Sequence, residues 1–238
     1  MKVLHVNPYP PEHLGGSEIF CKNLAINLNK QSYAKNDILT SDIFKHKKKI
    51  DYLDSSIKVI YKKCLYNLWG KNPVVDVSSY LKRHSSEYDL IHAHSYIFFT
   101  SFQCALMKKY RKVPMVLHVH GGVQTPSLLS SNPMEYFQLM WKKYIFDKTI
   151  GRFTVQNSDA LISVSKKDLD LLSRKYNLEG IKLFHIPNAV DISKFQSEGK
   201  SRREFITFIG RLSYIKGLDI FLEIVKALHE LNPHLKFL

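Results

Sequence analysis

The chain alternates short apolar runs with longer amphipathic stretches, and this alternation limits the folds it can adopt. The run 116–119 reads Val-Leu-His-Val and is apolar almost throughout, which is typical of strands buried on both faces of a parallel sheet. Such runs separated by helical patterns predict a doubly wound, parallel α/β sheet, that is, a Rossmann-like domain. The expected strands span 2–7, 37–43, 57–61, 89–93, 113–119, 160–164 and 182–186. The first expected helix begins at Ser17, which is its N-cap. Further helices are expected over 73–84, 96–109, 134–150 and 166–176.

The alternation breaks after the last of these strands. Pro187-Asn188-Ala189-Val190-Asp191 ends the strand, and a polar, charged stretch follows. We therefore expect a first domain over 1–187, a linker over 188–203 and the start of a second Rossmann-like domain over 204–238. One strand, one helix and the beginning of another strand cannot close a core, so the second domain is expected to be incomplete.

Charge narrows the classes of partner without choosing one. Lys+Arg is 35 and Asp+Glu is 21, a net charge of +14, which attracts nucleic acid, anionic lipid or nucleotide phosphates. A solvated lysine-rich surface explains the charge equally well. The chain carries no RRM, KH or zinc-finger signature, so nucleic acid is not expected as a partner.

Cysteine usage and hydropathy point to a reducing compartment. Cys21, Cys64 and Cys104 are scattered and odd in number, which disfavours a disulfide framework. No stretch approaches the roughly 18 unbroken apolar residues of a membrane span, and the N-terminus lacks the features of a signal peptide. We therefore expect a cytoplasmic protein, and the basic charge leaves peripheral contact with the inner face of the membrane open.

Three further patterns suggest other chemistry. His92-Ala93-His94 and His118-Val119-His120 each place two imidazoles on one strand face, a spacing that suits zinc, but no carboxylate completes a site and no metal is expected. The Asp168-Leu169-Asp170 pattern lies in an amphipathic stretch and is interpreted as a solvated helix face. The aromatic stretch 64–69 suits a membrane interface or a loop packed on its own domain, and we favour the second.

Four segments, taken in order, resemble one family. They are Pro8 to Pro11 with Gly15-Gly16-Ser17-Glu18, then His118 to Gly122, then Ile186 to Asp191, and last Phe208 to Leu212 with Lys216-Gly217-Leu218-Asp219. Together they resemble the retaining, nucleotide-sugar-dependent glycosyltransferases of family 4, which have the GT-B arrangement of two facing Rossmann-like domains. The resemblance covers the whole chain.

The resemblance implies a role for five residues. His120 would be the catalytic contact that reaches the transferring sugar and its phosphate, and Arg211 and Lys216 would grip the donor diphosphate. Gly15 and Gly16 would form a substrate loop that lets the backbone approach a ligand, ahead of a helix N-terminus that suits an anion. Each assignment has a simpler structural alternative. His120 could be a strand-end histidine bonded to nearby backbone, Arg211 and Lys216 could be surface cations, and the two glycines could form a turn that only joins strand to helix.

The resemblance also implies an activity and its partners. A complete relative would transfer a sugar from a nucleotide-diphosphate donor to an acceptor hydroxyl with retention, with no cofactor beyond the nucleotide-sugar substrate. The acceptor would be a sugar or a lipid-linked molecule. The downstream glutamate pair of the family has no match here, so we expect impaired activity. The alternative is a non-catalytic subunit that binds a glycan or lipid-linked acceptor and needs a second subunit for the donor site.

Overall fold

An eight-stranded sheet organises the first of two units in the computed structural model. These units are Met1–Ala189 and Val190–Leu238, and each is described by itself. The structure describes residues 1–45, 49–124, 133–192, 205–210 and 216–238. No helix in these ranges has the length and apolar character that a membrane crossing requires.

The strand order of the sheet is β10-β9-β8-β7-β1-β2-β4-β3, and all neighbours are parallel except β3 and β4. The chain runs outward from β1 to β4, then returns and runs outward from β7 to β10. The order therefore reverses between β1 and β7, and open α/β sheets place ligands at such switch points. The strands are β1 Lys2–Val6, β2 Lys35–Ser41, β3 Ile50–Leu53, β4 Ile57–Lys62, β7 Leu90–His94, β8 Met115–Val119, β9 Ala160–Ser163 and β10 Lys182–His185.

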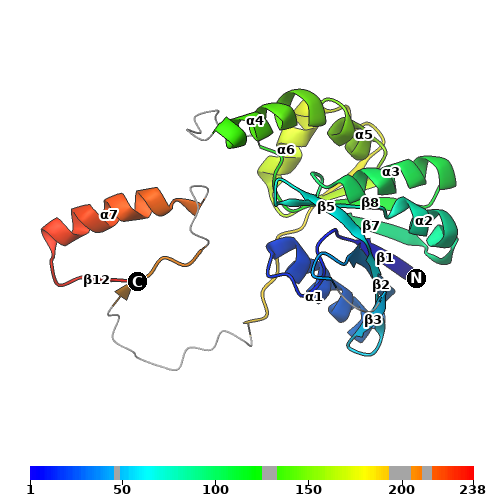
Figure 1. The fold of residues 1–238 in the computed structure, drawn as a ribbon, viewed down its shortest axis with the longest axis horizontal. Helices are drawn as coiled ribbons and strands as arrows, with labels where there is room; N and C mark the ends of the chain where they lie inside the picture. Colours follow the sequence, from blue (N-terminus) through cyan, green and yellow to red (C-terminus); the bar gives the residue numbers. More distant parts are fainter. Residues whose placement is uncertain (46–48, 125–132, 193–204, 211–215) are drawn as a thin grey trace. The chain divides into compact units, whose positions relative to one another are not determined.

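Helices cover both faces of the sheet (Figure 1). Helix α1 (Gly16–Lys30) packs against β2 and β4 on one face, and α3 (Phe99–Arg111) packs against β7 and β8 on the other. The remaining helices of this unit are α2 Ser78–His84, the 3₁₀ turn η1 Ser85–Glu87, α4 Pro133–Trp141, the π-helical turn η2 Lys142–Phe146, α5 Ile150–Gln156 and α6 Lys166–Lys175.

The two faces of the sheet are filled differently. The face toward α3 carries a large apolar cluster that includes Leu4, Ile91 and Leu117, none of them exposed. The face toward α1 carries a smaller apolar cluster around Ile38 and Val59, and the rest of that face is polar. One face therefore supplies most of the hydrophobic stabilisation, and the other is available for chemistry.

The sequence prediction of a Rossmann-like α/β fold with a mostly parallel sheet is confirmed. The helix expected over 73–84 is wrong in its first part, because β6 (Asn72–Val75) pairs antiparallel with β5 (Cys64–Leu68) in a separate hairpin. Only Ser78–His84 of that stretch is helical. The β-branched pair Val74-Val75 favours the strand.

The single helix expected over 134–150 is also wrong, because it is divided by the η2 turn. The backbone N–H of Asp147 bonds the carbonyl of Lys142, five residues back. Such π-helical turns shift the side chains that follow them around the helix. Asp147 is thereby directed into the interior, where it is 1% exposed.

Asp147 collects donors from three elements. The Tyr96 hydroxyl and the Lys175 ammonium both donate to its carboxylate, and Lys142 Nζ donates to its two oxygens at 3.2 and 3.1 Å. The Tyr176 hydroxyl donates to its backbone oxygen at 2.8 Å. Burial lowers the pKa of Lys142, and the neighbouring Asp147 charge opposes that shift.

The second unit has a short parallel pair, β11 (Phe205–Ile206) and β12 (Lys236–Phe237), connected through α7 (Leu218–Leu231). None of the α7 residues is buried, and Ile220 and Leu222 are 59% and 53% exposed. The linker predicted over 188–203 lies mostly outside the described residues.

We expect Asp147→Ala to destabilise the first unit by about 3–5 kcal/mol, because it leaves two partly buried ammonium groups without their counter-charge. Urea unfolding followed by circular dichroism measures this loss. The matched control is Asp170→Ala on the exposed side of α6, which should change stability by less than about 0.5 kcal/mol. Equal effects of the two changes would show that the Asp147 contacts contribute little.

We expect the backbone amides of α7 to exchange hydrogen at least about tenfold faster than those of α3, because α7 buries no side chain while α3 buries Cys104 and Ala105 completely. Native-state hydrogen exchange with mass spectrometry compares the two helices in one sample. Equal protection in both helices would contradict this expectation.

Candidate active site

Five histidines from three neighbouring strands share the face of the sheet that α1 covers. His5 lies on β1, His92 and His94 on β7, and His118 on β8, while His120 follows the end of β8. The register pairs His5 with His92 and His94 with His118. Because alternate residues of a strand point to the same face, all five rings come together at the switch point between β1 and β7.

The imidazole rings form a continuous stack. Ring centroids are 4.2 Å apart for His118 and His120, 4.4 Å for His92 and His94, and 5.4 Å for His94 and His120. His5 and His94 are fully buried, and His120 is half-buried at the edge. The stack therefore leads from the interior of the sheet to its carboxyl edge.

Helix α1 covers the histidine stack on the side away from the sheet. The Phe20 ring lies 4.7 Å from the ring of His118 and 5.0 Å from that of His120 in edge-to-face contacts. Cys21, one residue on, is also buried, and burial raises the pKa of its thiol. Phe20 thus brings the start of α1, with its glycine loop, to the same edge of the sheet as His120.

Burial keeps the stack uncharged. It lowers the pKa of His5 to about 4, of His118 to about 3 and of His120 to about 4. The pKa values of His92 and His94 lie well below the ordinary range for the same reason, and neighbouring histidines lower them further. Two adjacent imidazolium ions in this apolar setting would repel, so the neutral forms are the stable ones at pH 7.

Three of the rings are joined by hydrogen bonds. His5 Nε2 lies 2.9 Å from Asn36 Oδ1, His5 Nδ1 lies 3.1 Å from His94 Nε2, and His94 Nδ1 lies 3.1 Å from His120 Nε2. By contrast, both ring nitrogens of His118 and the Nε2 atom of His92 have no hydrogen-bond partner among the described residues. The five histidines therefore divide into a bonded set and a stacked set.

The stack fits a hydrogen-bonded array better than a metal centre. One nitrogen from each of His92, His94 and His118 lies within 4.8 Å of the others, so proximity alone would permit an ion. However, His94 uses both nitrogens in bonds to other histidines. The ring planes are also inclined by only 7° to 21°, so their in-plane lone pairs do not converge on one point as zinc ligands do.

The glycine loop lies at the N-terminus of α1, but its helix cap differs from the expected one. Gly15, not Ser17, is the N-cap residue. A Cβ at Gly15 would lie 2.0 Å from the Glu18 carboxylate, so a larger residue there would displace this buried acid from its present position. The Ser17 hydroxyl donates to Glu18 Oε1 at 2.8 Å, and His13 Nδ1 lies 3.6 Å from Glu18 Oε2.

The Glu18 carboxylate changes what this helix end can bind. It is 4% exposed and occupies the first turn of α1, where a negative charge is stabilised by the helix dipole. An added phosphate would meet that carboxylate as well as the N–H groups. The geometry therefore favours an uncharged, hydroxyl-bearing ligand next to Gly16, which is exposed.

Two further glycines open the space beyond His120. Gly121 and Gly122 have φ values of +98° and +77°, in the region that favours glycine. A Cβ at Gly121 would meet no atom of the described residues within 4 Å. With respect to those residues, the backbone after His120 is open to close approach by a ligand.

The two expected diphosphate contacts belong to the second unit. Arg211 lies outside the described residues. Lys216 is exposed and immediately precedes Gly217, the N-cap of α7, which has a φ of +72°. A Cβ at Gly210 would lie 3.8 Å from Lys216 Cβ, so the lysine stem lies beside Gly210.

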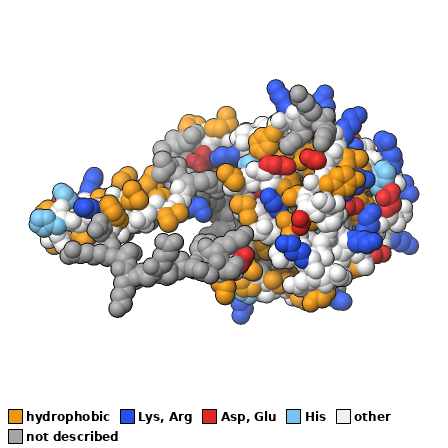
Figure 2. All heavy atoms as spheres, turned by 90° about the horizontal axis from the view of Figure 1, so that it is seen from below, with side chains coloured by type: hydrophobic (Ala, Val, Ile, Leu, Met, Phe, Trp, Pro, Cys, Tyr) orange, Lys and Arg blue, Asp and Glu red, His pale blue; other side chains and the backbone are white. Residues whose placement is uncertain are grey.

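Other candidate features lie away from this site. Asp168 and Asp170 lie on α6, where Asp170 is exposed and Asp168 follows the Ser165 N-cap. On the face that Figure 2 shows, lysine and arginine side chains are dispersed among apolar and acidic ones. This dispersal gives no support for a nucleic-acid site there.

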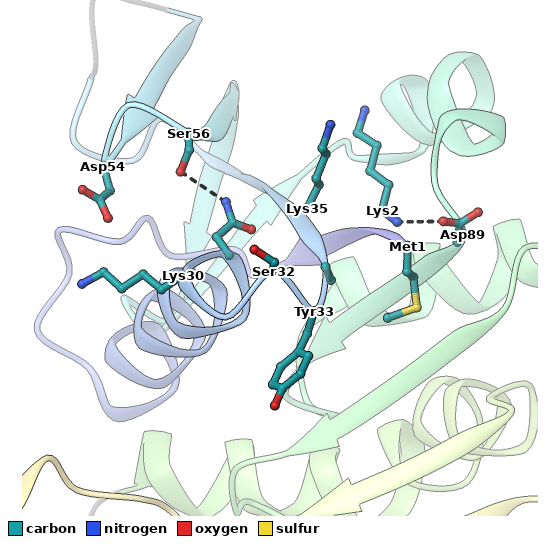
Figure 3. A pocket seen from close by; sticks show the side chains of 11 residues that line it. Met1, Lys2, Lys30, Ser32, Tyr33, Lys35, Asp54, Ser56 and Asp89 are labelled. Carbon is teal, nitrogen blue, oxygen red and sulfur yellow. Dashed lines mark hydrogen bonds between the residues drawn. The ribbon is translucent and has the colours of Figure 1, made fainter.

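A hollow also lies at the opposite edge of the sheet, near the amino ends of β1 and β2. Its side chains Lys30, Lys35 and Tyr33 point in different directions, and Lys2 N–H donates to Asp89 at 2.7 Å (Figure 3). Ligands of parallel sheets bind at the carboxyl edge, where this hollow does not lie.

Sequence reasoning named His120 and the glycine loop, whose roles stay predictions, but missed several neighbouring residues. His5 was not singled out, although it is a lone polar residue within a strand whose neighbours are buried, a signal that could have identified it. Asn36 gave no such signal, because it lies between Lys35 and Asp37. Glu18 and Phe20 gave no distinguishing signal.

We expect stability to fall as the pH drops from about 6.5 to about 4. Unfolded histidines have their ordinary pKa of 6.5, whereas His5 and His120 titrate near 4 when folded. The unfolded chain therefore binds more protons in this window, and each histidine can cost up to about 1.4 kcal/mol per pH unit. Above the window the full stability is present.

The urea midpoint of unfolding at pH 7.5, 6.5, 5.5 and 4.5 measures this decline. His118→Phe removes one buried titrating group and should flatten it, whereas His185→Phe on exposed β10 should not. A midpoint that stays constant from pH 7.5 to 4.5 would show that the buried histidines are not neutral in the folded chain.

Comparison with known proteins places these features in a family. A model of Glycosyltransferase Family 4 matches residues 14–194. A GDP-mannose:cellobiosyl-diphosphopolyprenol alpha-mannosyltransferase from Komagataeibacter xylinus is 24% identical over 234 residues, covering 98% of this chain and 55% of its own length. A UDP-Gal:alpha-D-GlcNAc-diphosphoundecaprenol alpha-1,3-galactosyltransferase from Escherichia coli is 25% identical over 197 residues, covering 76% and 48%.

Solved structures show the same fold. Sucrose-phosphate synthase from Thermosynechococcus elongatus superposes with a TM-score of 0.65 at 11% identity, over all of this chain and 70% of its own. Anabaena HepE in complex with UDP and glucose gives a TM-score of 0.65 at 16% identity, over all of this chain and 60% of its own. The chain spans about half the length of the curated relatives it matches. Since the family model covers the glycine loop, four of the five stacked histidines and every strand of the first sheet except β1, the chain belongs to glycosyltransferase family 4.

Proposed function

We propose that this chain takes part in sugar transfer from a nucleotide-diphosphate donor to an acceptor hydroxyl, with retention of anomeric configuration. The observation that carries the proposal is the contact of the Phe20 ring, one helical turn after Gly16, with the ring of His120, which brings the Gly15-Gly16 loop and His120 to the same edge of the sheet at its switch point. Ligands of such sheets bind there, and membership of family 4 supports a glycosyl group as the ligand.

Each site residue has a distinct part in this proposal. His120 contacts the transferring sugar, and the exposed loop at Gly16 lies against the acceptor. Lys216, with Arg211, holds the donor diphosphate and offsets the charge that develops on the leaving nucleotide, which lowers the barrier. The buried Glu18 carboxylate keeps phosphate away from the start of α1 and so favours a hydroxyl there.

We propose further that the acceptor is lipid-linked. The two curated relatives are named for acceptors on diphosphopolyprenol carriers. In this chain Phe137 and Ile145, near α4 and η2, are 57% and 51% exposed. Lys143 and Lys148 lie close by in the sequence. Apolar side chains beside lysines suit the surface of an anionic membrane, where such a carrier resides.

The β5–β6 hairpin extends this surface. Its Trp69 ring lies 5.4 Å from that of Trp141 on α4, so the hairpin packs on its own domain as the sequence favoured. Leu65 and Tyr66 remain 61% and 57% exposed. Peripheral contact with a membrane through the hairpin and α4 would bring the first unit to a lipid-linked acceptor.

The second candidate function is a non-catalytic subunit, in which the exposed loop at Gly16 binds the acceptor while another chain supplies the donor site. The two candidates differ in whether the 238 residues turn over donor on their own.

The test is a transfer assay with labelled UDP-glucose, UDP-galactose or GDP-mannose and a polyprenyl-diphosphate-linked saccharide in detergent. We expect slow transfer with a retained anomeric centre, read by NMR of the product. His120→Ala should lower the rate by about ten- to a hundredfold, because losing a hydrogen bond in a buried site costs about 1–3 kcal/mol.

The matched control is His185→Ala on exposed β10, which should leave the rate unchanged. An inverted product, or an unchanged rate in His120→Ala, would contradict the proposed role. Acceptor retention without any transfer would favour the subunit, and native mass spectrometry would then be expected to detect a second chain.

A further inference from the structure

The hydrogen-bonded histidines begin at a residue whose orientation is fixed by the backbone. The backbone N–H of Asn36 donates to Asn29 Oδ1 at 3.0 Å, so that Asn29 atom is the oxygen. The Asn36 amide nitrogen donates to the carbonyl of Ala34 at 2.9 Å and to the same Asn29 oxygen at 2.6 Å. The remaining side-chain atom of Asn36, which faces His5, must therefore be its carbonyl oxygen.

This orientation determines each ring in turn. A carbonyl oxygen only accepts, so His5 Nε2 carries the proton and His5 Nδ1 is an acceptor. His94 Nε2 must then donate to His5 Nδ1, which leaves His94 Nδ1 as an acceptor. His120 Nε2 must in turn donate to His94 Nδ1.

The argument requires that all three rings are neutral, since an imidazolium donates from both nitrogens and would break the sequence of donors and acceptors. Burial holds the pKa values of His5 and His120 at about 4, and that of His94 well below the ordinary range. At pH 7 each ring therefore carries one proton, and its position is set by its neighbour.

We propose that Asn36, His5 and His94 are positioning residues that hold His120 in its Nε2–H form, so that its Nδ1 is presented as a hydrogen-bond acceptor. In the described part of the chain no group bonds this Nδ1. That the acceptor meets a substrate rests on the function proposed above; the tautomer itself does not.

The fixed form specifies the chemistry of the group that His120 can bind. A bare Nδ1 lone pair attracts a hydroxyl hydrogen and repels a phosphate oxygen. His120 thus recognises a sugar hydroxyl, and the diphosphate must be held by other residues. The donor sugar or acceptor sugar must carry a free hydroxyl at this point, and a derivative lacking it should bind less tightly.

His118 provides an internal control for this proposal. The ring centroids of His118 and His120 are 4.2 Å apart, closer than those of His120 and its hydrogen-bonded neighbour His94. Yet neither nitrogen of His118 bonds any described residue. Replacing His118 disturbs packing next to His120 but leaves the series of hydrogen bonds intact. Replacing His5 breaks that series at a ring that is separated from His120 by His94.

The experiment reads the tautomer directly in the full 238-residue chain, without substrate. Long-range ¹H–¹⁵N correlation spectra of ¹⁵N-labelled protein at pH 7 distinguish a protonated ring nitrogen from a bare one, and His120→Gln identifies the His120 signals by their loss. We expect His120 to show a protonated Nε2 and a bare Nδ1.

In His5→Phe, His94 loses its acceptor and can reverse its proton, so we expect His120 to shift to a mixture of both forms or to Nδ1–H. In His118→Phe we expect the wild-type pattern to persist. Circular dichroism verifies that both variants fold, and if His5→Phe does not, the wild-type spectrum still decides the question.

A protonated Nδ1 at His120 in the wild-type chain would overturn the proposal. So would an unchanged tautomer in a folded His5→Phe variant, or an equal change in His118→Phe. The expected tautomers together with no sugar transfer would count against the proposed function alone, because the spectra require no substrate.

Discussion

The site depends on the burial of neutral imidazoles between a parallel sheet and one helix. A strand such as β8 is buried on both faces, yet one of its faces presents His118 rather than an aliphatic residue. Burying a polar ring is costly unless it is hydrogen-bonded, and burying it in its charged form costs far more. Low dielectric keeps these rings neutral, and neutrality in turn lets each bonded ring donate in one direction only. The direction of each hydrogen bond from Asn36 through His5 and His94 to His120 follows from that single condition.

Apolar packing on the opposite face of the sheet offsets the free-energy cost of burying these polar rings. There the side chains of β1, β7 and β8 belong to a large apolar cluster with α3, α5 and α6. The Asp147 contacts join η2 and α6 to Tyr96, the second residue after β7. Because that half of the domain is stabilised by area and by paired charges, the α1 face can carry unpartnered nitrogens, each costing about 1–3 kcal/mol.

Sequence periodicity predicted the repeated units of this fold but not its exceptions. Strand β8 and helix α3 have strong apolar patterns, and both form close to the expected positions. The β5–β6 hairpin was missed because its turn lacks the usual signal: Trp69 takes a φ of +54° beside Gly70, a position that asparagine or glycine normally fills. The break at η2 depends on Asp147 meeting partners from distant segments, which local periodicity does not record.

The same limit applies to the site. His120 was recognisable as a polar residue after a buried strand, because strand ends are readable from the sequence. His5 and Asn36 became partners only through the strand order β7-β1-β2, which places residue 5 opposite residues 38 and 92 and brings the side chains of residues 36 and 94 within hydrogen-bond distance of it. The His5–His94 bond crosses the point where that order reverses. Beside the switch point of the sheet, where parallel sheets bind their ligands, the interior of this chain therefore carries a polar connection from Asn36 on β2 to His120 at the end of β8.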